Sequence, residues 1–78
     1  MKRRDKIIRY QAHAEQRMQE RSISKEQVFK TIVQRDHEGP AKRPGALRFE
    51  KALTRRNRLA VIAEELDDAI VVISAFWK

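Results

Sequence analysis

The residues of this chain whose types and spacing suit chemistry are His13, Arg17 and Arg21, in the segment AHAEQRMQERSIS. Residues four apart share one face of a helix, so a helix here would align the three side chains in a row. An imidazole exchanges protons near neutral pH, and two guanidinium groups beside it offer planar, permanently charged forks to phosphate. The row therefore favours chemistry at a phosphodiester. The alternatives are a solvated basic face, or a core-edge histidine hydrogen-bonded to a sheet.

Cleavage of RNA without a metal ion needs a group that moves protons and cations that stabilise charge on the phosphate. We expect His13 to transfer the proton, and Arg17 and Arg21 to hold the phosphate. Arg48 would supply a third cation from a strand that a packed helix faces. Ser74, the lone hydroxyl of an apolar final segment, would orient the substrate or satisfy a backbone group.

The charge of the chain is unevenly distributed around a net value of +7. Residues 1–58 hold 17 Lys and Arg against 7 Asp and Glu, whereas residues 59–78 hold one Lys against four acids. Such a field attracts polyanions, so we expect a nucleic acid or an acidic protein as partner, unless the charge serves solubility alone. Five further cations are predicted to contact nucleic acid: Lys42, Arg43, Arg55, Arg56 and Arg58.

Length and composition exclude several classes of protein. With 78 residues the chain is expected to form a single domain, residues 1–78. It has no cysteine, and its two histidines lack the spacing of a metal site, so we expect neither a metal nor a cofactor. No segment approaches the roughly 18 apolar residues of a membrane span, and no signal-peptide core follows the charged N-terminus. We therefore expect a cytoplasmic protein without a membrane partner.

The first half of the chain is predicted to be a basic arm, residues 1–6, and a helical hairpin, residues 11–35. Between them, Ile7–Tyr10 is a β-prone stretch that either adds an edge strand or leads as coil into the first helix. Ala14 and Met18 give the helix at residues 11–21 a narrow apolar stripe. For the helix at residues 25–35, Ser24 and Gln27 form the pattern of a capping box. Its core-facing residues are predicted to be Val28, Phe29, Ile32 and Val33.

The second half is predicted to be an antiparallel β-meander, residues 46–77. Residues 36–45 hold both glycines and both prolines and are expected to be a loop. Apolar residues then alternate along strands at 47–53, 59–65 and 69–77. The last strand would place Ala69, Val71, Ile73, Ala75 and Trp77 on one side, and Ile70, Val72, Ser74 and Phe76 on the other.

The predicted fold class is α+β, with two N-terminal helices packed on a three- to four-stranded antiparallel β-meander. Two helices can cover only one face of such a sheet. An uncovered apolar face on a small domain marks a partner surface, so we expect a homodimer through this face or a bound protein partner.

The segment Tyr10–Val28 resembles the bacterial family known as domain of unknown function 4258 (DUF4258). Its members look like a short strand, a His-Ala segment with Arg-Met and a second Arg, an Ile-Ser turn, and a final strand reading roughly Ile-Ile-Thr-Val-Tyr. The matching positions here are His13-Ala14, Arg17-Met18, Arg21, Ile23-Ser24, Val28, residues 72–76, and Arg48 on the first meander strand. Ser22 stands where the family often has Gly, and Ser74 and Phe76 stand where Thr and Tyr are usual in the family.

This resemblance implies a layout similar to the RelE/ParE-like toxins, an analogy of fold. With it, the leading hypothesis is a RelE-like RNase toxin that binds and cleaves RNA, on the ribosome, and whose basic surface an acidic antitoxin covers. His13, Arg17, Arg21, Arg48 and Ser74 would form its catalytic site. The alternative is a non-catalytic basic dimeric adaptor or nucleic-acid-binding module, in which the same row is structural.

Overall fold

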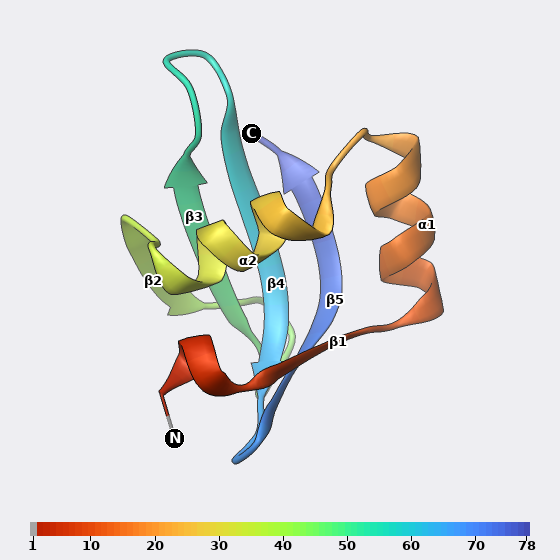
Figure 1. Cartoon of the computed structure of the whole chain (residues 1–78), viewed down its shortest axis with the longest axis vertical. Helices are drawn as coiled ribbons and strands as arrows, with labels where there is room; N and C mark the ends of the chain where they lie inside the picture. The colour runs from red at the N-terminus through yellow and green to blue at the C-terminus, as the bar shows by residue number, and fades with distance from the viewer. Residues whose placement is uncertain (1) are drawn as a thin grey trace.

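The computed structural model describes residues 2–78; Met1, the first residue of the expected basic arm, lies outside the described residues. The elements (Figure 1) are a 3-10 turn η1 (Arg3–Asp5), β1 (Ile7–Tyr10), α1 (Ala12–Glu20), α2 (Lys25–Val33), β2 (His37–Pro40), β3 (Leu47–Ala52), β4 (Arg58–Glu65) and β5 (Ala69–Trp77). The chain is α+β, as predicted. No helix within residues 2–78 has the length and apolar character needed to cross a bilayer.

The five strands form one mixed sheet in the order β1-β5-β4-β3-β2. β1 runs parallel to β5, with Ile7 opposite Ala69 and Tyr10 opposite Val72, and all other neighbours are antiparallel. The predicted antiparallel meander is present as β3, β4 and β5, and Ile7–Tyr10 forms the edge strand that was one of two alternatives. The predicted arrangement is wrong in two respects: the sheet has five strands and is mixed, because β1 is parallel to its neighbour, and a strand precedes the helices. The four residues of β1, Ile-Ile-Arg-Tyr, carry no information about which distant strand they will pair with, or in which direction.

The strand β2 lies inside residues 36–45, the segment predicted to be a loop. It pairs with β3, with His37 opposite Glu50 and Pro40 opposite Leu47. Because β2 is the last strand of the sheet, the N–H that Pro40 lacks is not needed for a further ladder. Gly and Pro thus mark an edge strand here rather than exclude a strand.

The capping box predicted for α2 is confirmed. The Ser24 hydroxyl accepts a hydrogen bond from the Gln27 N–H at 3.1 Å, and the Gln27 side chain accepts one from the Ser24 N–H at 2.9 Å. The buried face of α2 consists of Val28, Thr31 and Ile32. Phe29, predicted to face the core, is 41% exposed because it lies on the flank of this face.

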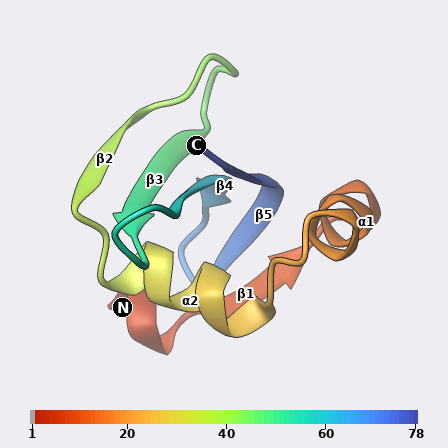
Figure 2. The same ribbon diagram turned by 90° about the horizontal axis from the view of Figure 1, so that it is seen from above.

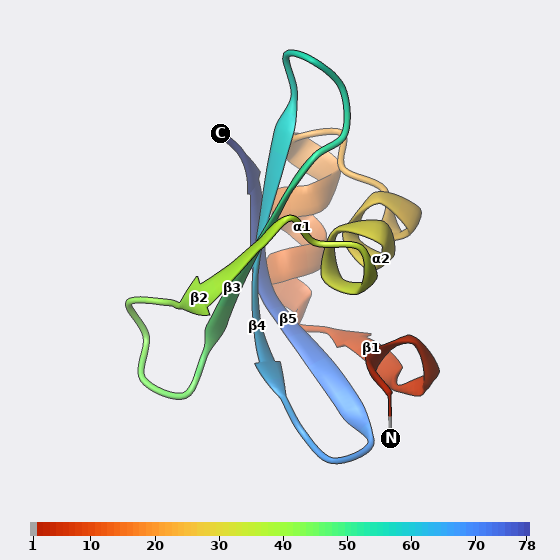
Figure 3. The same cartoon turned by 90° about the vertical axis from the view of Figure 1, so that its left-hand side faces the viewer.

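The core lies between the helices and one face of the sheet. α1 packs on β5, and α2 packs on β3 and β4. Figure 3 shows both helices on the same side of the sheet, whereas β2 and the β2–β3 loop bend toward the other side. The buried side chains on the helix-covered face come from all three central strands: Phe49, Leu59, Val61, Ala63, Ile70, Val72 and Ala75.

A β-bulge changes which residues of β5 face this core. Ser74 pairs with Ile62, but Val72 pairs with the next residue, Ala63, so that Ile73 has no partner on β4. The extra residue reverses the alternation. Val72 therefore shares the core face with Ala75, and the predicted grouping of Val71 and Ile73 with Ala75 and Trp77 is wrong.

The face turned away from the helices is called here the open face. From β3, β4 and β5 it carries Arg48, Glu50, Arg58, Ile62, Ser74 and Phe76, which alternate with the core residues. Seen from above (Figure 2), α1 lies beyond β5 at one edge of the sheet, and β2 lies at the opposite edge.

The N-terminal segment is tied to the sheet by ion pairs. The Arg3 guanidinium donates to Glu65 at 2.8 Å and to Glu38 at 2.6 Å, and Lys6 donates to Glu65 at 3.1 Å. Hydrogen bonds from Arg3 and then Lys6 lower the pKa of Glu65 to about 2. This network joins η1 to β4 and β2.

Two of the described residues have a positive φ, and substitutions there test how much backbone strain each position carries. Ser22, with φ of 56°, ends α1 in the left-handed conformation that favours glycine, and Gly45 has φ of 82° with open space where a Cβ would lie. We expect Ser22→Gly to raise the free energy of unfolding by about 0.5–1 kcal/mol, and Gly45→Ala to lower it by a similar amount, because each exchange changes the strain at φ > 0. Urea unfolding followed by circular dichroism measures both, and equal effects of the same sign would contradict this account.

Candidate nucleic-acid interface

The predicted row is present on α1, and its first two members touch each other. His13 is exposed, and the Arg17 Nε donates a hydrogen bond to the His13 Nε2 at 3.3 Å. Arg17 also lies 3.4 Å from the Glu20 carboxylate, a pair on the helix surface. An acceptor Nε2 places the proton of the neutral imidazole on Nδ1. In this arrangement the Nε2 lone pair of His13, the site that would accept a proton, accepts the hydrogen bond of the Arg17 guanidinium instead.

Arg21, the third member of the row, anchors the helix to the sheet. One of its terminal nitrogens donates to the Ala75 carbonyl at 2.8 Å, and its own carbonyl accepts from the Trp77 indole N–H at 2.8 Å. β1 pairs with β5 only as far as Val72, so the rest of this strand edge borders α1 instead. The Arg21 side chain therefore donates a hydrogen bond to a backbone carbonyl of this edge, beyond the point where β1 pairs.

The two flanks of α1 face different parts of the molecule. Glu15 and Gln19 line a shallow hollow that also includes Lys25 of α2, so this flank faces the helix-covered side. On a helix, His13 and Arg17 lie on the opposite side of the buried Ala14–Met18 stripe. The row consequently lies on the flank of α1 that is turned away from α2.

Arg48 and Ser74 share the open face. The register aligns Arg48 of β3 with Ile62 of β4, and Ile62 with Ser74 of β5, in one row across the sheet. We expected a packed helix to face Arg48, but both helices lie on the other side (Figure 3). The structure therefore separates the expected catalytic residues into a row on α1 and a row on the sheet, with the edge of β5 between them.

A buried carboxylate that the sequence analysis did not select organises the open face. Glu50 is 6% exposed and accepts hydrogen bonds from Arg48 at 2.6 Å, Arg58 at 3.0 Å and Lys78 at 3.4 Å. Burial alone would raise the pKa of Glu50, but the hydrogen bonds from Arg58, Arg48 and Lys78 outweigh it and lower the pKa to about 2. The sequence held one signal for Glu50: the alternation of apolar and charged residues along β3 places this acid on the same face as Arg48.

A groove opens on this face beside the buried carboxylate. It has a volume of about 580 Å³, and the β2–β3 loop forms one of its walls. Its lining combines cations with apolar side chains: Pro40, Ala41, Lys42, Arg43, Arg48, Ile62 and Phe76. Lys42 and Arg43 are exposed, and the only ion pair that either makes among residues 2–78 is a long contact of 3.6 Å between Arg43 and Glu64. Two of the predicted nucleic-acid contacts thus belong to the groove.

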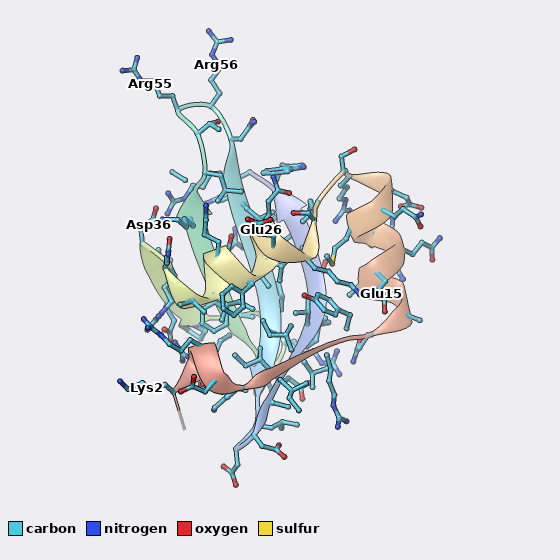
Figure 4. All side chains as sticks on the ribbon, viewed as in Figure 1. Lys2, Glu15, Glu26, Asp36, Arg55 and Arg56 are labelled. Carbon is cyan, nitrogen blue, oxygen red and sulfur yellow. The ribbon has the colours of Figure 1, made fainter. Side chains whose placement is uncertain are left out.

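The other predicted nucleic-acid contacts do not share this groove. Arg55 and Arg56 occupy the tip of the β3–β4 hairpin, which projects beyond the rest of the molecule (Figure 4). The Thr54 hydroxyl fixes this turn by accepting from the Asn57 N–H at 3.1 Å. Arg58 is bound to both Asp36 and Glu50. Within residues 2–78, no three His, Asp or Glu side chains come together in a way that could hold a metal ion.

Fold and site together define a small basic α+β protein with a cationic open sheet face bordered by a His/Arg helix. The family resemblance is confirmed: a family model matches residues 10–77, and the chain belongs to the family described as domain of unknown function DUF4258. No curated protein and no solved structure matches the chain.

The carboxylates with lowered pKa predict how stability depends on pH. Glu50 and Glu65 have a pKa of about 2 against an ordinary value of 4.5, so their contribution is complete above pH 4.5 and is lost as the pH falls toward 2. We expect Glu50→Gln to be less stable at neutral pH and to lose stability less steeply over this interval. Urea unfolding at several pH values measures the slope, with the exposed Glu26→Gln as control. An unchanged slope in Glu50→Gln would contradict the role of this carboxylate.

Proposed function

We propose that this protein binds RNA with the open face of its sheet and the adjoining row on α1. The observation that carries the proposal is that Lys42, Arg43 and Arg48 gather with Phe76 around one groove on the face that no helix covers. Cations hold a phosphate backbone, and an aromatic or guanidinium plane contacts bases. The net charge of +7 supports the same class of ligand.

The binding proposal predicts a strong and local dependence on salt. Affinity for a single-stranded oligoribonucleotide should fall with rising salt, and replacing Lys42 and Arg43 by Ala should weaken binding and reduce the slope of log K against log salt by about 1.4, since each lost phosphate contact contributes about 0.7. Fluorescence anisotropy at several salt concentrations measures this.

The matched control removes the same charge elsewhere. Lys25→Ala with Lys30→Ala takes two cations from the exposed face of α2, on the covered side of the sheet. This double variant should retain most of the affinity. If the two double variants lose equal affinity and slope, the ligand is held by net charge and the open face is not the interface.

Cleavage of the bound RNA is the second candidate function, and the His13–Arg17 contact favours it. In the proposed step, the 2′-hydroxyl oxygen bonds to phosphorus while the bond from phosphorus to the 5′-oxygen breaks. The His13 Nε2 accepts the proton of the 2′-hydroxyl, and a water molecule protonates the leaving 5′-oxygen. The hydroxide so formed takes the proton from His13, and the product is a 2′,3′-cyclic phosphate with a free 5′-hydroxyl on the other fragment. Phosphate binding to Arg17 would release the Nε2 from its hydrogen bond, so that the base becomes available where the substrate lies.

This candidate predicts a difference between the two histidines. His13→Ala should lower the rate of RNA cleavage about 10²- to 10⁴-fold, the range for a lost general base, whereas His37→Ala on β2 should leave it unchanged. Incubation of each purified variant with RNA, with and without ribosomes, measures the products. Equal cleavage by both variants would remove His13 from the mechanism, and binding without cleavage by the unaltered protein would leave the non-catalytic nucleic-acid-binding module.

A toxin role, with an acidic antitoxin over the basic surface and a layout similar to RelE, stays part of this second candidate. It requires that expression of the active protein arrests growth and that His13→Ala relieves the arrest. The expected homodimer also stays a prediction, and it is an alternative to RNA binding in the groove. Its proposed contact is the same open face, where Ile62 and Phe76 are half-buried within the single chain, so a dimer formed there would cover the groove.

A further inference from the structure

The Arg48 guanidinium is held in a fixed orientation between an acid and an aromatic ring. Its Nε donates to Glu50 at 2.6 Å, and its central carbon lies 5.2 Å from the centre of the Phe76 ring. A cation at this distance from an aromatic centroid is attracted to the ring. Because Glu50 is itself bound by Arg58 and Lys78, the position of Arg48 is fixed from two directions.

This fixed side chain forms part of the groove and remains accessible there. The Arg48 side chain is 32% exposed, and it lines the groove together with Phe76 and Ile62. With its Nε committed to Glu50, Arg48 is poorly placed to wrap a phosphate with its whole fork. Its plane, backed by an aromatic ring, is instead suited to stacking, because a guanidinium stacks on flat π systems.

We infer that the groove is a binding site for one unstacked base of single-stranded RNA. The base stacks on the Arg48 guanidinium, with Phe76 behind it, and Lys42 and Arg43 bind the phosphates on either side. This inference rests on the proposed RNA binding and changes one predicted role, because Arg48 contacts the base and not the scissile phosphate. Bases inside a duplex are not free to enter such a groove, so the site selects single strands.

Three probes of closely similar charge test the inference: a short single-stranded oligoribonucleotide, the same strand with abasic positions at its centre, and a hairpin duplex of the same number of phosphates. Removing a stacked base costs about 5- to 150-fold in affinity, so we expect the abasic strand and the duplex to bind at least fivefold more weakly. Anisotropy titrations at one salt concentration measure all three.

Charge-preserving variants separate stacking from electrostatics. Arg48→Lys keeps the cation but loses the plane, and it should lower affinity for the intact single strand about tenfold while leaving the abasic strand unaffected. Arg4→Lys, on the exposed N-terminal turn η1 outside the groove, should change neither by more than about twofold, because it keeps the charge and lies away from the bound base. Phe76→Leu should reproduce the Arg48→Lys pattern without altering Glu50, and circular dichroism checks that each variant is folded.

The outcomes distinguish this inference from the proposed function. Tight binding to all three probes with equal affinity would overturn the base site and leave RNA binding in place. A loss in Arg48→Lys that is equal for intact and abasic strands would also overturn it, because the side chain would then act through charge. Failure to bind any probe would overturn the proposed function together with the base site.

Discussion

The fold depends on one topological constraint: β1 and β2 follow one another among the strands of the chain but lie at opposite edges of the sheet. With strands about 4.8 Å apart, the connection must travel roughly 19 Å across the sheet. The two helices make this crossing, α1 beside β5 and α2 over β4 and β3. Both helices, of nine residues each, lie on one face of the sheet (Figure 3). The other face must therefore be stabilised by its own side chains.

The open face is stabilised by charge instead of by a second layer. A carboxylate buried as deeply as Glu50 is costly unless several donors compensate it. Arg58 from β4 and Lys78 after β5 supply that compensation together with Arg48, so the pairing of β3, β4 and β5 and the burial of Glu50 require each other. The same arrangement fixes the guanidinium that lines the groove. A structural requirement of the sheet and the geometry of the candidate site therefore have a common origin.

Local signals predicted the local parts of this structure. The capping pattern at Ser24 located the start of α2, and alternation placed Phe49 and Val61 in the core. Features that depend on distant residues were not predictable: the parallel pairing of β1, the edge strand β2, and the bulge at Ile73 that reverses the faces of β5. The spacing of the row on α1 was visible in the sequence, whereas the side of the sheet that it borders follows from topology alone.

The two parts of the candidate site are joined through the last residues of β5. Ala75 accepts a hydrogen bond from Arg21, and Trp77 donates one to the Arg21 carbonyl, so the end of α1 is fixed to residues on either side of Phe76. Since successive residues of a strand point to opposite faces, Phe76 itself lines the groove under Arg48. The position of His13 and Arg17 relative to the groove is thus set by a strand shared by both.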